Sequence, residues 1–188
     1  AWYYAMHRPE KIESLIVLNA PHPACFEREI RHWRQLRRSW YIGVFQIPWL
    51  PEAVLAAGKA YFIGAIFERM RVSSEYLPNH IVCRYRHQAS EPGALTAMVN
   101  YYRAAIRGGG AARQRSLGYP AVTLPTLVIW GLHDQALAHQ NLDGLDGFAT
   151  DLTVVKLEHS GHFVHQDEPQ RVTDEILGWL QRHPRHNS

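Results

Sequence analysis

Three short apolar runs, far apart in a chain of 188 residues, constrain its fold more than any other feature. They are "SLIVLNA" at 14–20, "PTLVIWG" at 125–131 and "LTVVKLE" at 152–158. Continuous apolar runs of this length are typical of strands buried on both faces, as in a parallel sheet covered by helices. Helical patterns lie at 1–8, at about 138–146 and at about 168–182. This alternation of helices and strands predicts an α/β layered domain.

The middle of the chain has a different pattern, with helices alone between residues 25 and 107. The candidate helices cover 25–40, 52–70, 75–88 and 92–107. A glycine-rich link, "RGGGAARQRSLGYP" at 107–120, then leads back to the strands. We therefore expect an all-helical lid at 25–107, inserted into an α/β core that comprises 1–24 and 108–188.

The basic residues are the first feature to weigh for partners, because the formal net charge is +3. The densest basic stretch is "REIRHWRQLRR" at 28–38, where arginines recur at helical spacing: Arg28, Arg31, Arg34 and Arg38. The residues between them include Ile30, Trp33 and Leu36. This pattern predicts an amphipathic helix with a solvated basic face. No nucleic-acid-binding motif accompanies it, so we expect no nucleic-acid partner.

Other broad classes fit the composition less well. No run of about 18 consecutive apolar residues occurs, which predicts no membrane span, and no basic-then-apolar segment opens the chain. We therefore expect a cytoplasmic protein. The two cysteines, Cys25 and Cys83, form neither a disulfide framework nor a pair at zinc-ligand spacing. We expect both to be reduced packing residues.

The ends of the second and third apolar runs carry residues suited to proton transfer. Asp134 follows "PTLVIWG", and His162 follows "LTVVKLE" after a glycine. Carboxyl ends of neighbouring parallel strands meet at one edge of a sheet, where an aspartate can orient an imidazole that moves a proton. An aspartate in such a turn is more often a turn residue, but the pairing favours catalysis. His159 and His165 lack a preceding glycine, and no ligand spacing indicates a metal site.

Longer motifs around these residues resemble a known family. "PTLVIWGLHDQAL" and "LEHSGHFVHQDEPQRV" are similar to the C-terminal signature of α/β-hydrolases, in which a Gly-x-x-Asp turn supplies the acid and a Gly-His turn the histidine. The opening "AWYYAMHRPEKIESLIVLNAPHP" resembles the segment after the nucleophile elbow in the epoxide hydrolase and haloacid dehalogenase branch. The family's chain order is nucleophile, acid, histidine. The resemblance covers essentially the whole chain and implies an aspartate nucleophile upstream of Ala1.

Two segments of the expected lid resemble the epoxide hydrolase branch in particular. "RSWYIGVFQIPWLPE" at 38–52 and "ALTAMVNYYRAAIR" at 94–107 are similar to the segments that bear the ring-opening tyrosines, which fall on Tyr41 and Tyr102. Two phenols suit this reaction, because the leaving alkoxide needs hydrogen-bond donors and then a proton. The alternative is that both tyrosines only pack the lid. Four further aromatic residues either line an apolar substrate pocket or fill the seam between lid and core: Trp40, Phe45, Trp49 and Phe163.

The resemblance implies hydrolysis of small apolar epoxides to diols, without cofactor or metal. An upstream aspartate would form an ester, which water activated by His162 and oriented by Asp134 would hydrolyse. One alternative is a haloalkane or haloacid dehalogenase, in which a halide leaves. Another is a non-catalytic fragment or interaction module. Without the nucleophile the chain alone is expected to be inactive, and an unpaired sheet edge at 14–20 predicts self-association.

Overall fold

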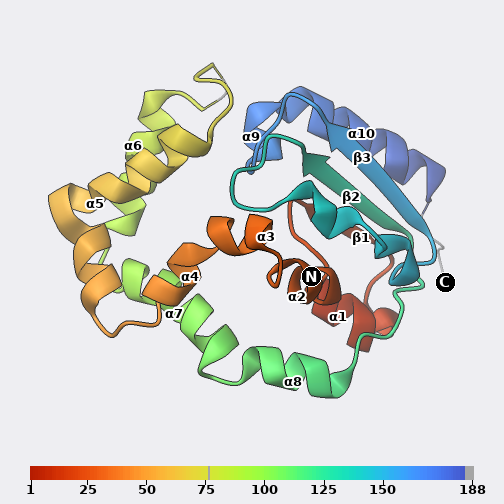
Figure 1. Ribbon diagram of the computed structural model, residues 1–188. Helices are drawn as coiled ribbons and strands as arrows, with labels where there is room; N and C mark the ends of the chain where they lie inside the picture. Colours follow the sequence, from red (N-terminus) through yellow and green to blue (C-terminus); the bar gives the residue numbers. More distant parts are fainter. Residues whose placement is uncertain (76, 185–188) are drawn as a thin grey trace.

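The computed structural model describes residues 1–75 and 77–184. Three strands form one parallel sheet in the order β1 (Leu15–Leu18), β2 (Thr126–Gly131) and β3 (Leu152–Leu157). In register, Thr126 lies opposite Leu15 on one side and Leu152 on the other. The three apolar runs therefore form the predicted strands, and their carboxyl ends lie along one edge of the sheet (Figure 1).

Helices cover both faces of this sheet, which confirms the predicted layered α/β class. On one face, α1 (Trp2–His7) and α2 (Pro23–Glu29) contribute Trp2, Met6 and Cys25 to a core shared with Val17 and Val128. On the other face, α9 (Val164–Asp167) and α10 (Pro169–Arg182) pack against β2 and β3, as Figure 1 shows. All six residues of β2 are buried, because the strand faces a helical layer on each side.

Trp179 of α10 is 1% exposed and donates a hydrogen bond from Nε1 to Thr153 Oγ1 at 3.1 Å. Its indole therefore joins α10 to β3 through both apolar contact and a hydrogen bond. Where an α-helix was expected at 138–146, the chain instead forms two short 3₁₀ turns, η2 (His139–Leu142) and η3 (Leu145–Gly147). Gly144 between them has a φ of 69°, a left-handed conformation that ends the first turn. A third 3₁₀ turn, η1 (Pro9–Lys11), links α1 to β1.

Between β1 and β2 the described residues form helices joined by loops, and no strand pairs with the sheet there, as predicted. After α2 come α3 (Trp33–Arg38), α4 (Trp40–Val44), α5 (Leu50–Met70), α6 (Asn79–Ala89), α7 (Ala94–Ile106) and α8 (Gly110–Leu117). Helices α5, α6 and α7 share an apolar cluster of their own, which includes Leu55, Ile63 and Val99. They project away from the sheet, at the left of Figure 1. The predicted helix at 75–88 begins later, at Asn79, and part of its expected start, residue 76, lies outside the described residues.

The prediction of one amphipathic helix at 28–38 is wrong in two respects. The segment forms the end of α2 and the separate α3, and the side chain buried in α3 is Gln35, whereas Trp33 and Leu36 are 74% and 48% exposed. Gln35 accepts a hydrogen bond from Ala138 N at 2.9 Å and donates to Ala136 O at 2.9 Å. The glutamine supplies partners for the backbone of the loop after β2, so it occupies the inner face in place of an apolar residue.

The expected glycine-rich link at 107–120 is also wrong, because most of it forms α8. Gly109 has a φ of 72° at the start of this helix, which allows a sharp turn out of α7. A Cβ on Gly108 would lie 2.7 Å from Ala104 O. The glycines therefore form a tight turn between two helices, and the residues that follow are good helix formers.

By length and composition, α5 is the one helix in the described part of the chain that is apolar enough to cross a membrane, although no long uninterrupted apolar run exists. Its backbone is not continuously helical, however. Residues 57–60 leave the helical conformation, with φ of 60°, 56° and 55° at Gly58, Lys59 and Ala60. This kink divides α5 into two pieces, which pack against α6 and α7. On α6, Cys83 is exposed, so the expectation that both cysteines are packing residues holds only for buried Cys25.

Candidate functional site

Asp134 and His162 meet at the carboxyl-end edge of the sheet. His162 Nδ1 lies 2.8 Å from Asp134 Oδ2, within the hydrogen-bond distance that their positions after β2 and β3 predict. Asp134 is 3% exposed, whereas the His162 side chain is 28% exposed. Because an ionised carboxylate only accepts hydrogen bonds, this contact places the imidazole proton on Nδ1 and leaves Nε2 free to accept a proton.

The carboxylate of Asp134 is held by four donors. Oδ1 accepts from the backbone N–H groups of Ala136 and Leu137, at 2.7 and 2.8 Å. Oδ2 accepts from His162 and from Asn19 Nδ2, the latter at 2.6 Å. These bonds occupy both oxygens and set the plane of the carboxylate, so the orientation of the acid is defined before any substrate binds. Arg38 additionally donates from Nη1 to the backbone oxygen of Asp134 at 2.7 Å.

Glycines explain how the loop that carries His162 comes so close to β2. A Cβ on Gly131 would lie 2.2 Å from Gly161 O and 2.5 Å from Ser160 O. No side chain fits at that distance, so the glycine that ends β2 is required by the close passage of the next loop. His133 N also donates to Ser160 O at 2.9 Å. Gly131, three residues before Asp134, and Ser160-Gly161, directly before His162, are therefore in contact with each other.

Asp167 ties the same loop to the helical region. Asp167 is only 2% exposed, and its carboxylate accepts hydrogen bonds from Gly161 N at 2.8 Å and from Val72 N at 3.2 Å. Val72 lies two residues after Met70, the last residue of α5. Asp167 was not predicted from the sequence, because its burial follows from the packing of the structure and not from a local pattern.

Tyr41 and Tyr102 lie against one another, from α4 and α7. Their ring centroids are 5.7 Å apart at an interplanar angle of 85°, and the edge of Phe45 contacts both rings. Burial raises the pKa of Tyr41 above its ordinary value, and the neighbouring Tyr102 hydroxyl and the more distant Asp134 carboxylate raise it further. Tyr41 therefore stays protonated near neutral pH and can donate a hydrogen bond.

Arg103 anchors the segment that carries Tyr102. Its guanidinium pairs with both carboxylate oxygens of Glu52 at the start of α5. The same group donates to Phe45 O at 2.9 Å and to Ile47 O at 2.7 Å. Since Arg103 adjoins Tyr102 and Phe45 contacts Tyr41, this one side chain holds together the elements that carry the two phenols.

The four aromatic residues predicted to line a substrate pocket lie in different environments. Phe45 packs between the two tyrosines, and Phe163 lies next to His162, with ring centroids 5.1 Å apart. Trp40 and Trp49 are 67% and 74% exposed, and in residues 1–75 and 77–184 no ring contact joins either of them to these groups. The structure thus brings two of the four to the candidate site.

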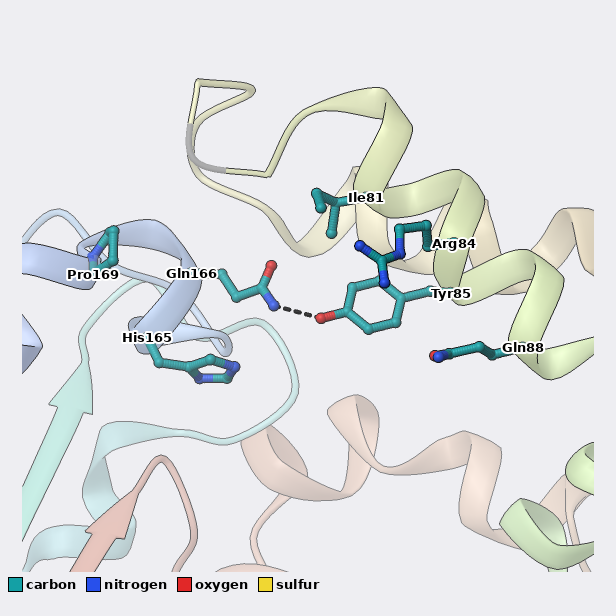
Figure 2. A pocket seen from close by; sticks show the side chains of 7 residues that line it. All are labelled: Ile81, Arg84, Tyr85, Gln88, His165, Gln166 and Pro169. Atoms are coloured by element: carbon teal, nitrogen blue, oxygen red, sulfur yellow. Dashed lines mark hydrogen bonds between the residues drawn. The ribbon is translucent and has the colours of Figure 1, made fainter.

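A stack of rings leads from Phe163 into the helical region. Phe67 of α5 stacks on Phe163 at 4.9 Å and on Tyr85 of α6 at 4.3 Å. The Tyr85 hydroxyl in turn accepts a hydrogen bond from Gln166 of α9, which Figure 2 shows. These contacts add to the bond between Val72 and Asp167. The histidine loop and the helices α5 and α6 are therefore joined by both apolar and polar contacts.

A pocket of about 350 Å³ lies between α6 and α9, beside this junction. Its lining residues, drawn in Figure 2, are Ile81, Arg84, Tyr85, Gln88, His165, Gln166 and Pro169. His165 thus lines this pocket and is not part of the Asp134–His162 dyad. His159 is exposed. The lining includes neither the dyad residues Asp134 and His162 nor the phenols Tyr41 and Tyr102. The pocket therefore adjoins the candidate site but does not contain it. Among the described residues no group of three or more His, Cys, Asp or Glu could hold a metal ion.

His22 is fully buried and caps α2. Its Nδ1 accepts a hydrogen bond from Ala24 N at 3.3 Å. Its ring stacks on Phe148 at 4.6 Å and meets the edge of Trp2 at 5.1 Å. Burial lowers the pKa of His22 to about 4, so it is neutral near physiological pH. Its contacts support α2 and the loop after β1.

Comparison with known proteins agrees with this geometry. A model described as the alpha/beta hydrolase fold matches residues 1–169. Epoxide hydrolase 2 of Caenorhabditis elegans is 30% identical over 91% of this chain and 48% of its own length. The AB hydrolase superfamily protein YfhM of Bacillus subtilis is 31% identical over 96% of this chain and 61% of its own length. The chain thus spans about half the length of the curated relatives it matches.

A solved structure of Bacillus megaterium epoxide hydrolase in complex with an inhibitor is also similar. It superposes with a TM-score of 0.84 at 26% sequence identity. The match covers 96% of this chain and 64% of that chain. The similarity therefore includes the helical region between β1 and β2 as well as the sheet.

Proposed function

The chain belongs to the α/β-hydrolase fold family, and on this premise we propose that it forms the acid, histidine and lid part of an epoxide hydrolase. The observation that carries the proposal is the combination of a dyad and a pair of phenols. Asp134 and His162 are hydrogen-bonded at 2.8 Å, and Tyr41 and Tyr102 lie together, close enough to Asp134 for its charge to raise the pKa of Tyr41. Sequence similarity to named epoxide hydrolases supports the same reaction.

In the proposed first step, an aspartate attacks one carbon of the epoxide ring. The carbon–oxygen bond breaks as the new ester bond forms, and the negative charge moves to the ring oxygen. Tyr41 and Tyr102 donate hydrogen bonds to that oxygen, and one of them gives it a proton. Two phenols suit this step because each is a neutral donor that does not compete with the aspartate as a nucleophile.

In the second step, the ester is hydrolysed. His162 Nε2 takes a proton from water, and the resulting hydroxide attacks the ester carbonyl. The ester carbon–oxygen bond breaks, the leaving oxygen of the diol takes the proton of the aspartyl carboxyl group, and the carboxylate is restored. The proton on His162 then returns through solvent to the tyrosine that gave one up in the first step. Asp134 orients the imidazole through Nδ1 and stabilises the positive charge that His162 acquires. Neither step uses a cofactor.

The proposed nucleophile is an aspartate upstream of Ala1, in line with the family's order of nucleophile, acid and histidine. With that aspartate absent, His162 acts at most as a base on water, and residues 1–188 alone have no appreciable epoxide hydrolase activity. We also propose that β1, which pairs with β2 and no other strand among the described residues, offers its free edge to another strand or to a second copy of the chain.

Dehalogenation is the alternative in the same family, since the ester chemistry is shared and only the leaving group differs. A halide leaves without a proton and needs polarised N–H donors, whereas an alkoxide needs both donors and a proton. The paired hydroxyls of Tyr41 and Tyr102 favour the epoxide.

The test is to assay styrene oxide and a chloroalkane with residues 1–188, alone and together with an N-terminal half that carries the aspartate turn. We expect diol formation only when residues 1–188 are combined with the N-terminal half. Chloride release without diol formation would favour the dehalogenase. Robust diol formation by residues 1–188 alone, lost in His162→Ala, would contradict an upstream nucleophile.

A further inference from the structure

Asn19 is a buried polar residue at the end of β1 to which the mechanism above gives no part. It is 4% exposed and has a φ of 41°, in the left-handed region that non-glycine residues rarely adopt. Asparagine tolerates this region better than most residues, but the conformation still carries strain. Backbone strain at a buried position beside the dyad indicates that contacts of the side chain hold Asn19 in this conformation.

The side-chain amide of Asn19 contacts three segments at once. Its Oδ1 accepts from Gly131 N at 2.8 Å, at the end of β2. Its Nδ2 donates to Asp134 Oδ2 at 2.6 Å and to Gly161 O at 3.2 Å. Because a backbone N–H only donates and a carboxylate only accepts, these partners settle which end of the amide is oxygen and which is nitrogen. Asn19 therefore directs an N–H group at the same carboxylate oxygen that His162 contacts.

We propose that Asn19 is a positioning residue for the Asp134–His162 dyad. Its N–H fills one acceptor position of Oδ2 and leaves the other for His162 Nδ1, so that the imidazole takes one orientation. The second Nδ2 contact, with Gly161 O, holds the residue just before His162 at the same time. One amide thus sets both partners of the dyad relative to each other. The inference rests on the proposed function for its catalytic meaning, although its geometry stands without it.

The other groups around Asp134 do not duplicate this contact. Arg38 donates to the backbone oxygen of Asp134 and not to its carboxylate. Ala136 and Leu137 donate to Oδ1. Without Asn19, Oδ2 has His162 as its remaining donor among the described residues, and one end of the carboxylate is free to turn.

A purely structural role is the competing explanation, since Asn19 also joins the ends of β1 and β2. Two substitutions separate the explanations. Asn19→Gly removes all three side-chain bonds but accepts a positive φ without strain. Asn19→Asp also tolerates the positive φ and keeps an oxygen to accept from Gly131 N–H. At about pH 9, where even a carboxyl group next to another carboxylate is ionised, it places a second negative charge against Asp134. If Asn19 has only a structural role, Asn19→Asp should disturb the His162 Nδ1 proton less than Asn19→Gly does. If Asn19 positions the dyad, Asn19→Asp should disturb that proton at least as much.

The first readout needs no substrate. In ¹⁵N-labelled full chain, the Nδ1 proton of His162 is followed by NMR, and its exchange rate with water is measured. Loss of one supporting hydrogen bond, worth about 1 kcal/mol, should accelerate this exchange by about fivefold in Asn19→Gly, and by at least as much in Asn19→Asp. Circular dichroism and thermal unfolding verify that each variant is folded. Asn141→Gly is the matched control, because Asn141 is equally buried and bonds to Gln35 and Ala138 but not to the dyad.

The second readout uses the protein that carries the aspartate nucleophile. Asn19→Gly should slow hydrolysis of the ester by about tenfold or more while ester formation stays near the wild-type rate, since a small displacement of the base affects only the step that uses it. A general loss of structure would slow both steps together.

The outcomes are separable. Faster proton exchange in both Asn19 variants and not in Asn141→Gly supports the proposal. Wild-type exchange in Asn19→Asp, or equal acceleration in Asn141→Gly, would overturn it, and so would failure of both Asn19 variants to fold. If exchange changes as expected but no diol forms in the wild-type protein, the positioning role stands and epoxide hydrolysis is the proposal that fails.

Discussion

The carboxyl-end edge of the sheet and the helical region at 40–106 differ in which side chains they bury and which they expose. At the sheet edge, polar residues such as Asn19 and Asp134 are buried, and their hydrogen bonds join β1, β2 and the histidine loop. In the helical region, large apolar side chains such as Trp49, Tyr61 and Tyr101 are 74%, 58% and 77% exposed. A buried hydrogen-bond network permits one arrangement, whereas exposed apolar contacts permit several.

The difference indicates where chemical precision resides in this chain. The acid and histidine depend on long-range backbone and side-chain bonds that a single displacement would break. The phenols depend on α4 and α7, which are connected by the ring contacts of Tyr102 with Tyr41 and Phe45 and by the hydrogen bond from Arg103 to Phe45 O. We therefore expect substitutions at the sheet edge to be more damaging than equivalent substitutions in the helical region.

The largest effect is expected for His162→Ala in the protein that carries the aspartate nucleophile. Loss of the base should slow ester hydrolysis by about 10²–10⁴-fold, while formation of the ester continues. Mass spectrometry should detect the covalent adduct. His159→Ala is the matched control, since that exposed histidine lies three positions upstream and should leave turnover unchanged. Unchanged turnover in His162→Ala would remove the proposed base.

A comparison of two tryptophans measures the same contrast through stability. Trp179→Ala should lower the free energy of unfolding by about 3–5 kcal/mol, because the side chain is fully buried against β3 and leaves a cavity. Trp49→Ala should change it by about 0.5 kcal/mol or less, since that side chain is 74% exposed. Urea unfolding followed by circular dichroism measures both. A large loss in Trp49→Ala would mean that the helical region holds its surface more tightly than its exposure indicates.

The phenols should matter for ring opening and hardly for stability. Replacing both Tyr41 and Tyr102 by Phe keeps the ring contacts but removes both donors, and should slow ester formation by about 10²–10³-fold in the protein with the nucleophile. Pre-steady-state measurement of adduct formation is the appropriate assay. Tyr101→Phe, on the adjacent and exposed ring, is the control. If the double variant opens epoxides at the wild-type rate, the tyrosines serve only in packing.

The smallest of the four effects is a pH dependence from His22. Its pKa in the folded state, about 4, lies below the ordinary value of 6.5, so the unfolded chain takes up the proton first as pH falls. This contribution to stability is complete above about pH 6.5 and decreases between there and about pH 4. At pH 5 the loss is about 2 kcal/mol.

The substitution His22→Asn tests this assignment, because it keeps an acceptor for Ala24 N–H and removes the titrating group. Urea unfolding at pH 7 and pH 5 should show a smaller difference for this variant than for the wild-type chain. His133→Asn, at an exposed position, should retain the wild-type difference. An equal pH dependence in wild type and His22→Asn would assign the effect to other groups.

The sequence by itself determined the parts of the fold that depend on local patterns. Continuous apolar runs mark β1, β2 and β3 because strands buried on both faces have no polar side to display. Asp134 and His162 were predictable for a related reason, since residues that follow parallel strands reach the same edge of a sheet. Tyr41 and Tyr102 were located by resemblance to a family motif, and their contact with each other came only from the structure.

The tertiary structure decided which partner each of these residues has. In α3 the buried residue is Gln35 rather than Trp33, because the loop after β2 lacks partners for its backbone and the glutamine supplies them. Asn19 and Asp167 bond to groups 115 and 95 residues away along the chain, at Asp134 and Val72. Periodicity records whether a position is buried, but a hydrogen bond depends on two groups meeting in space. Local sequence cannot specify that meeting, and only the packing of the strands and helices brings it about.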